Sequence, residues 1–172
     1  MKKAKTSKLF SWGKDLGLII ALVLAITAWQ SRHLLETDGS VQLPELRLVA
    51  LDTGGSEPLA REGKQTLIYF FAPWCRVCSL SIGNLQYLNS TDVNIVTVAM
   101  DYQSIEQVQD FVDEHQVQSQ VLLGTQGLKE TFKLKGYPTY YLLNEQKQVI
   151  ASSMGYSSAL GLKLTTLMNK QS

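Results

Sequence analysis

The 172-residue sequence contains only two cysteines, Cys75 and Cys78, and two histidines, His33 and His115. Two cysteines exclude a scaffold held by many disulfides and cannot supply a four-cysteine zinc site. The net charge of +1 gives no basic surface that would indicate a nucleic-acid partner. Neither histidine is accompanied by residues that would orient it as a ligand. We therefore expect both histidines to be exposed, and we expect no metal site and no cofactor.

The near-neutral total conceals an uneven distribution of charge. Residues 1–14 carry five lysines and no acidic residue, whereas residues 36–172 carry ten Lys or Arg against fourteen Asp or Glu. The stretch between them, residues 16–31, is uncharged and mostly apolar. As a helix, the interval from Lys14 to Arg32 would be about 25 Å long, which is the short end for crossing a bilayer.

We interpret residues 16–31 as an uncleaved, single-pass transmembrane anchor; the alternatives are a cleaved signal peptide and a buried helix. Cleavage after Ala28 would place Ile26 where a signal peptidase requires a small residue, which favours the anchor. Trp12 and Trp29 lie near the two ends, as in interfacial aromatic belts. Because lysines precede the segment, the N-terminus is expected in the cytoplasm and the rest of the chain in the bacterial periplasm, attached to the inner membrane. An oxidising compartment allows a cysteine pair to cycle through a disulfide.

The predicted organisation is a basic cytoplasmic segment (1–15), the anchor (16–31), a polar linker (32–42) and one domain (43–172). Strands and helices alternate in the domain, which predicts an α/β fold with a mixed central sheet flanked by helices. Continuous apolar runs indicate strands buried on both faces, and alternating apolar and polar residues indicate half-buried strands. A capping box formed by Ser104 and Gln107 indicates the start of a helix. Gly136 is expected to end a second helix, and the last helix is expected to be amphipathic. The expected strands are 46–52, 66–71, 93–100, 120–124, 139–144 and 148–152, and the expected helices are 104–115, 125–136 and 157–170.

Cys75 and Cys78 follow the strand expected at residues 66–71 and precede residues with helical spacing. The positive end of a helix stabilises a thiolate, so two cysteines in its first turn can act as a nucleophile and a resolving thiol. We expect the more exposed Cys75 to attack and the more buried Cys78 to resolve. Arg76 would further favour the thiolate and make the disulfide more oxidising. A structural disulfide would close too small a loop to stabilise the fold much, and a peroxidase would require Thr or Ser in place of Ala72.

The stretch FFAPWCRVC, followed later by GYPTYYLL, resembles the thioredoxin superfamily over roughly residues 43–170. The resemblance implies a thioredoxin-like fold and a thiol–disulfide oxidoreductase with catalytic residues Cys75 and Cys78. It also implies substrate-binding roles for Trp74, Tyr137 and Pro138, with a cis bond before Pro138 and this proline facing the dithiol. The alternative, from a different class of protein, is a metal-handling protein that binds Cu(I) through the same two thiolates.

The N-terminal anchor and the helix-plus-strand segment at residues 104–124 resemble the membrane-anchored periplasmic (TlpA/DsbE-like) branch of this superfamily. The ending ASSMGYSSALGLKLTTLM is most similar to the copper-sensitivity suppressor protein D type. This resemblance implies periplasmic protein dithiols or disulfides as substrates and a membrane redox partner. The sequence departs from the family at Tyr69 and Ser81, where thioredoxins and cytochrome-maturation reductases, respectively, carry an acid, and at Gly83, which replaces a proline. These departures leave the direction of electron flow open.

Overall fold

The computed structural model describes residues 15–22, 25–26, 32–88 and 93–169. The chain divides into two units, Met1–His33 and Leu34–Ser172. In the first unit, residues 15–22 and 25–26 are helical. Among the described residues, no helix is both long enough and apolar enough to cross a membrane. Part of the segment expected to form the anchor, residues 23–24 and 27–31, lies outside the described residues, so the anchor stays a prediction.

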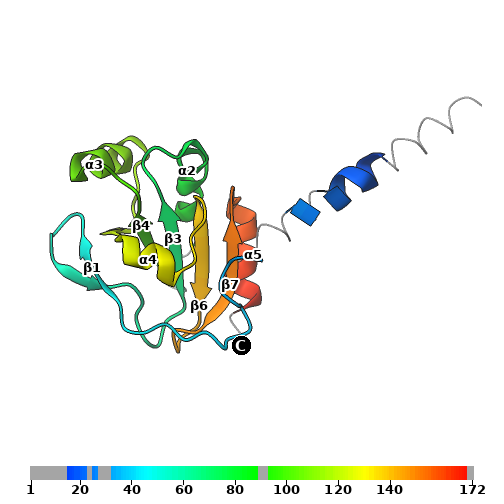
Figure 1. Cartoon of the computed structure of the whole chain (residues 1–172), viewed down its shortest axis with the longest axis horizontal. Helices are drawn as coiled ribbons and strands as arrows, with labels where there is room; N and C mark the ends of the chain where they lie inside the picture. Colours follow the sequence, from blue (N-terminus) through cyan, green and yellow to red (C-terminus); the bar gives the residue numbers. More distant parts are fainter. Residues whose placement is uncertain (1–14, 23–24, 27–31, 89–92, 170–172) are drawn as a thin grey trace, which may run out of the picture. The chain divides into compact units, whose positions relative to one another are not determined.

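The second unit is built on a mixed sheet with the strand order β2-β1-β5-β4-β3-β6-β7 (Figure 1). The central strand β3 is parallel to β4 and antiparallel to β6, and all six of its residues are buried. This burial explains its continuous run of apolar residues, because both faces of the strand are covered. The strands are β1 (Arg47–Ala50), β2 (Ser56–Pro58), β3 (Thr66–Phe71), β4 (Asn94–Ala99), β5 (Gln120–Leu123), β6 (Thr139–Leu143) and β7 (Val149–Met154).

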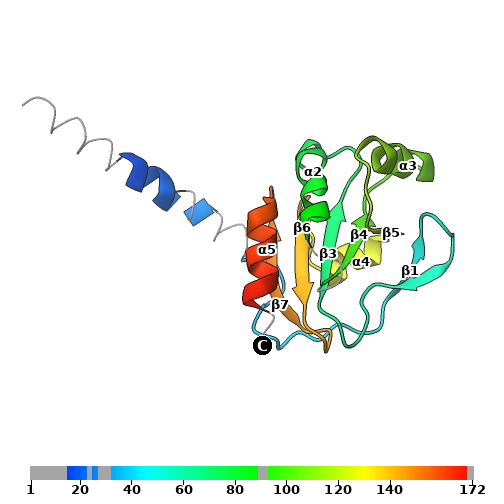
Figure 2. The ribbon, with the colours of Figure 1, turned by 180° about the vertical axis from the view of Figure 1, so that it is seen from behind.

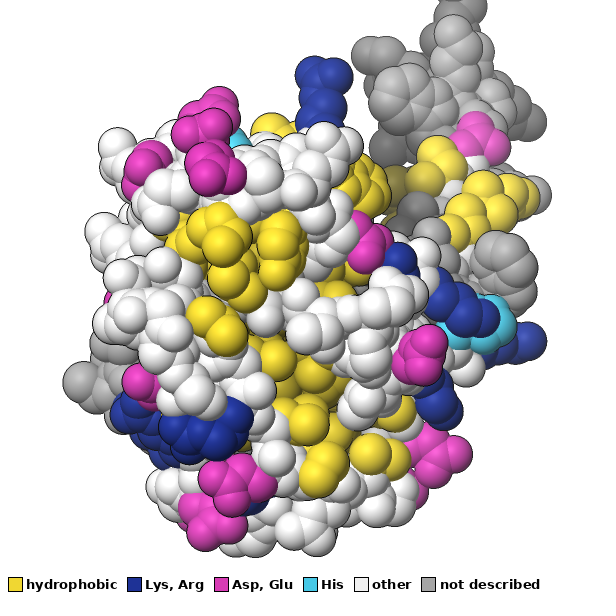
Figure 3. Space-filling view, turned by 60° about the vertical axis from the view of Figure 1, so that its left-hand side comes forward, with side chains coloured by type: hydrophobic (Ala, Val, Ile, Leu, Met, Phe, Trp, Pro, Cys, Tyr) yellow, Lys and Arg dark blue, Asp and Glu magenta, His cyan; other side chains and the backbone are white. Residues whose placement is uncertain are grey.

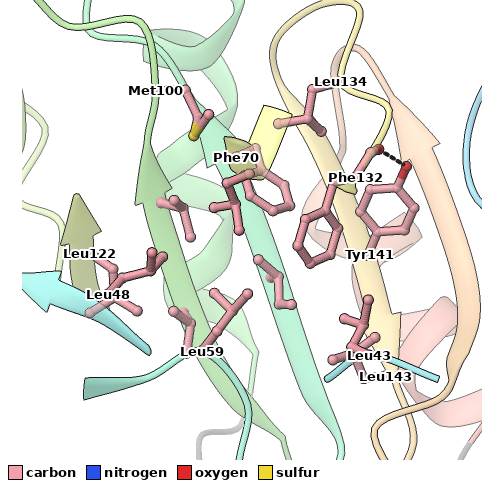
Figure 4. Close-up of a cluster of buried hydrophobic side chains, with 14 of the residues drawn as sticks. Leu43, Leu48, Leu59, Phe70, Met100, Leu122, Phe132, Leu134, Tyr141 and Leu143 are labelled. Atoms are coloured by element: carbon pink, nitrogen blue, oxygen red, sulfur yellow. Dashed lines mark hydrogen bonds between the residues drawn. The ribbon is translucent and has the colours of Figure 1, made fainter. Parts of the chain in front are cut away.

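Helices cover both faces of the sheet, as Figures 1 and 2 show from opposite sides. On one face, α4 packs with the segment that precedes β1; the buried side chains there include Phe70, Phe132 and Tyr141 (Figure 4). On the other face, α2, the 3-10 helix η1, α3 and α5 pack around a second cluster that contains both cysteines. The helices are α2 (Arg76–Ser81), η1 (Ile82–Tyr87), α3 (Ile105–Glu114), α4 (Gln126–Thr131) and α5 (Ala159–Met168).

Residues from the predicted linker also pack into the first core cluster. Leu34 and Leu35 are buried, and the Leu35 N–H donates to the Tyr141 hydroxyl oxygen at 3.3 Å. The Tyr141 hydroxyl in turn donates to the Phe132 carbonyl at 2.7 Å, the bond drawn in Figure 4. Burial raises the pKa of Tyr141 to about 12. These hydrogen bonds give a buried phenol both a donor and an acceptor, as burial of a polar group requires.

The register of the sheet brings three loops to one edge. Because β3 and β4 are parallel, with Phe71 opposite Ala99, the residues that follow both strands lie at the same edge. Strand β6 runs the other way and begins at that edge, with Thr139 opposite Phe70. The helix-plus-strand segment expected between β4 and α4 is present: α3 packs on the sheet, and β5 pairs with β4 and β1. The fold is therefore the predicted α/β arrangement, a mixed sheet flanked by helices with a central helix-plus-strand segment.

Two expectations about helices are wrong. Gly136 does not end α4, which stops at Thr131; Lys133 adopts the left-handed φ of 49° that a glycine usually supplies. The Leu134 N–H then bonds to the Lys129 carbonyl at 2.9 Å, which closes the helix end. Helix α5 is not amphipathic as expected: it buries Leu162 and Thr166 but exposes other apolar residues, namely Leu160, Leu164, Leu167 and Met168.

Candidate active site

Cys75 lies at the junction between β3 and α2, as the sequence predicts. It is the N-cap residue of α2, with an extended backbone, and its N–H bonds to the Ala72 carbonyl at 2.9 Å. The Cys78 backbone N–H donates to the Cys75 sulfur at 3.3 Å. A side chain at an N-cap accepts such a bond because the first N–H groups of a helix have no partner within it. The same bond would stabilise negative charge on the sulfur, which a nucleophilic thiol requires.

The two cysteines are free thiols with different exposure. Cys75 retains 7% of its surface, whereas Cys78 is fully buried. Burial raises the pKa of Cys78, and the adjacent Cys75 side chain raises it further. Because only a thiolate attacks a disulfide, Cys78 is held in its unreactive form while Cys75 is the sulfur that solvent reaches.

The loop before β6 contributes the second side of the site. The Tyr137–Pro138 peptide bond is cis, which confirms the prediction made from the GYPT stretch. The Cys75 thiol donates to the Tyr137 carbonyl oxygen at 3.3 Å, so this loop and the first cysteine are in direct contact. The structure thus brings together residues that are far apart in the chain, and it places the backbone of Tyr137 beside the sulfur.

Trp74 is 60% exposed, and its indole lies edge-on to Tyr137 with ring centroids 6.1 Å apart. Its indole N–H donates to the backbone carbonyl of Asp101 at 2.9 Å. The Asp101 carboxylate accepts from the Tyr137 hydroxyl at 3.2 Å and from the Lys129 ammonium at 2.6 Å. Burial and the Asp101 carboxylate raise the pKa of Tyr137. The sequence interpretation missed Asp101 and Lys129; the available signal was that Asp101 follows β4 closely, at the same edge as the cysteines.

Tyr69 and Ser81, the positions where related families carry acids, are hydrogen-bonded to each other. Their hydroxyl oxygens lie 2.5 Å apart in the buried layer beneath Cys78, and both residues are fully buried. The Ser81 hydroxyl donates to the Val77 carbonyl at 2.9 Å, so the Tyr69 hydroxyl must donate to Ser81. Burial raises the pKa of Tyr69, which therefore stays neutral. A neutral hydroxyl pair thus replaces ionisable carboxylates beside the dithiol.

The surface around the dithiol exposes the apolar side chains of Trp74, Val77 and Leu80, together with the charged Arg76. The neighbouring acidic side chains of α3 gather at the top of Figure 3, with exposed hydrophobic side chains below them. A pocket of about 480 Å³ lies at the other edge of the sheet, where Asn94 and Gln120 begin β4 and β5. Among residues 15–22, 25–26, 32–88 and 93–169, no three metal-binding side chains are grouped.

Comparisons with known proteins agree with this fold. The family model described as Redoxin matches residues 39–163. "Thioredoxin-like protein YneN" from Bacillus subtilis is 24% identical over 76% of this chain and 82% of its own length. "Sporulation thiol-disulfide oxidoreductase A" from the same organism is 24% identical over 87% of this chain and 95% of its own length. The crystal structure of StoA from Bacillus subtilis superimposes with a TM-score of 0.64 at 22% identity, covering 72% of this chain and 96% of that one.

Proposed function

We propose that this chain, which belongs to the Redoxin family, is a membrane-anchored thiol–disulfide oxidoreductase that exchanges disulfides with other proteins through Cys75 and Cys78. The observation that carries the proposal is the environment of the Cys75 sulfur. It accepts the Cys78 N–H and donates to the Tyr137 carbonyl, both at 3.3 Å, close to exposed apolar side chains. The names of two relatives, a thioredoxin-like protein and a thiol-disulfide oxidoreductase, support the same reaction class.

The reaction that these residues can perform proceeds in two exchanges. When the chain acts as a reductant, the Cys75 thiolate attacks one sulfur of a substrate disulfide, the substrate S–S bond breaks, and the leaving thiolate takes up a proton. Cys78 then loses its proton and attacks the Cys75 sulfur, which releases the second substrate thiol and leaves a Cys75–Cys78 disulfide. The substrate gains two electrons and two protons, and the dithiol loses them. The reverse sequence oxidises a substrate dithiol.

The substrate class follows from the surface that Trp74 and Tyr137 form beside the Cys75 sulfur. The Tyr137 backbone lies beside the Cys75 sulfur, where an extended polypeptide could pair with it as an added strand. Exposed apolar side chains nearby, including Trp74 and Leu80, suit the side chains of an unfolded segment. We therefore assign substrate-binding roles to Trp74, Tyr137 and Pro138 and expect cysteine-containing polypeptides as substrates, together with a membrane redox partner that regenerates the dithiol.

The proposed location is the bacterial inner membrane, with a cytoplasmic N-terminus and a periplasmic catalytic domain. In the helical residues 15–22, apolar side chains are exposed on successive positions, as suits a lipid environment; they include Leu16, Leu18, Ile19 and Leu22. Alkaline phosphatase fused after Ser172 should be active, because it requires the oxidising periplasm, whereas a reporter that works only in the cytoplasm should be silent. The opposite pattern would refute the proposed topology.

Trapping tests the proposed reaction. A full-length Cys78→Ser variant expressed in bacteria should accumulate mixed disulfides between Cys75 and its substrates, because the resolving sulfur is missing. The adducts would be identified by mass spectrometry after non-reducing purification. The matched control is Cys75→Ser, which keeps one thiol but should trap few proteins, since Cys78 is buried. Equal trapping by both variants, or none by Cys78→Ser, would contradict the assigned roles.

A further inference from the structure

We propose that Asp101 is a positioning residue that holds Trp74 and Tyr137 beside the Cys75 sulfur, and that it thereby determines affinity for polypeptide substrates. Asp101 is the residue that contacts both Trp74, through its backbone carbonyl, and Tyr137, through its carboxylate. Lys129 of α4 completes the group by pairing with the same carboxylate oxygen. The inference rests on the proposed function, because it assumes that the surface formed by Trp74 and Tyr137 binds a polypeptide.

Tyr137 is held by three different side-chain contacts. Its hydroxyl donates to the Asp101 carboxylate, the Lys129 ammonium lies 5.9 Å from its ring centroid, and Trp74 meets the ring edge-on. A cation at that distance from an aromatic ring is attracted to its face. Because the ring is fixed, the Tyr137 carbonyl oxygen stays in position to accept the hydrogen bond from the Cys75 thiol. Contacts at the far end of this side chain therefore control where its backbone meets an incoming substrate.

The backbone of Asp101 suits this position. Its φ is 47°, in the left-handed region that aspartate, asparagine and glycine adopt more readily than other residues. This conformation at the end of β4 directs the carbonyl to the Trp74 indole and the carboxylate to Tyr137 and Lys129. The two charged side chains are about 30% exposed, and such pairs contribute little to global stability. The expected role is thus to define geometry rather than to hold the fold together.

Substitution of Asp101 should weaken peptide binding without changing the rate of the thiol–disulfide exchange itself. Asp101→Gly removes both carboxylate contacts and tolerates the positive φ, whereas Asp101→Asn keeps an oxygen for the Tyr137 hydroxyl but loses the charge for Lys129. Asp110→Asn, on the exposed face of α3, is the control for the change in charge. Each full-length protein is reduced and mixed with an unfolded peptide that carries one disulfide. In parallel it is mixed with bis(2-hydroxyethyl) disulfide, which has no peptide backbone to pair with Tyr137.

In single turnovers, Asp101→Gly should raise the half-saturating peptide concentration about threefold to tenfold, with the maximal rate within twofold of wild type. The rate of Asp101→Gly with bis(2-hydroxyethyl) disulfide should also stay within twofold of wild type. The half-saturating peptide concentration of Asp101→Asn should lie between those of wild type and Asp101→Gly, and that of Asp110→Asn should match wild type. An unchanged half-saturating concentration, or equal losses with both disulfides, would overturn the positioning role. If the wild type itself reacts with neither disulfide, the proposed function fails, and the inference fails with it.

Discussion

The buried pair of Tyr69 and Ser81 allows a quantitative test of the packing beneath the dithiol. The Tyr69 hydroxyl donates to the Ser81 oxygen, and Ser81 donates onward to the Val77 carbonyl. Ser81→Ala leaves a fully buried phenol without an acceptor, which should cost about 1–3 kcal/mol of the free energy of unfolding. Tyr69→Phe leaves Ser81 its bond to Val77, so it should cost only about 0.5–1.5 kcal/mol.

The double variant Tyr69→Phe/Ser81→Ala shows whether the losses of stability in the two single variants come from one shared hydrogen bond or are independent. With both hydroxyls removed, no buried donor is left unpaired, so the double variant should be no less stable than Ser81→Ala alone. The coupling between Tyr69 and Ser81 should be about 1 kcal/mol or more. The assay is urea unfolding of the reduced protein at pH 7, with Tyr87→Phe, at an exposed tyrosine, as a control expected near zero. Costs of the two single variants that simply add in the double variant would refute the reasoning.

Three further predictions concern reactivity, pH and packing. Iodoacetamide at pH 7 should modify Cys75 before Cys78 in peptide mass spectra, because Cys78 is fully buried; the reverse order would contradict the assigned nucleophile. Since burial raises the pKa of Cys78, the unfolded state releases its proton above about pH 8.5 while the folded state keeps it. From pH 7.5 to 9.5, unfolding by urea should show the reduced wild type losing about 1.4 kcal/mol more stability than Cys78→Ser; equal losses would exclude this effect. Gly124→Ala would place a methyl group against Met100 Sδ and 2.9 Å from the Ala99 carbonyl oxygen, which should cost about 1–3 kcal/mol. In Gly127→Ala, in helix α4, the added methyl group would meet only the Thr125 hydroxyl, at an ordinary contact distance of 4.0 Å, so this variant should be neutral or stabilising. Similar urea midpoints for the two variants would argue against a close contact at Gly124.

Local sequence patterns predicted the central strands and the position of the cysteines between a strand and a helix. The run of apolar residues in β3 indicates burial on both faces, and the structure buries all six residues. Cys75 follows it closely and caps the next helix, as predicted. The resemblance to the thioredoxin superfamily is confirmed by the match to the Redoxin family, and the cis bond before Pro138 was predicted from that resemblance rather than from residue preferences.

Features that depend on tertiary contacts were not predictable in the same way. Lys133 ends α4 in a left-handed conformation because burial of Phe132 and Leu134 fixes the chain on both sides, and no glycine marks this position. The apolar residues of α5 indicated a single buried face, but the structure buries Leu162 and Thr166 and leaves most of the other apolar side chains of this helix exposed. The contacts of Asp101 join three segments that meet only through the strand register. The pairing of Tyr69 with Ser81 likewise requires the packing of α2 on β3.

The most direct test of the central claim is an equilibrium redox titration of the full-length protein in glutathione buffers, with Cys75 and Cys78 counted by alkylation and mass spectrometry. A thiol–disulfide oxidoreductase should show one two-electron transition, in which both thiols are lost together as a Cys75–Cys78 disulfide. The midpoint should lie between about −120 and −270 mV, the range of catalytic dithiols. Two cysteines that oxidise separately, or a pair that stays reduced throughout while binding Cu(I), would contradict a thiol–disulfide oxidoreductase.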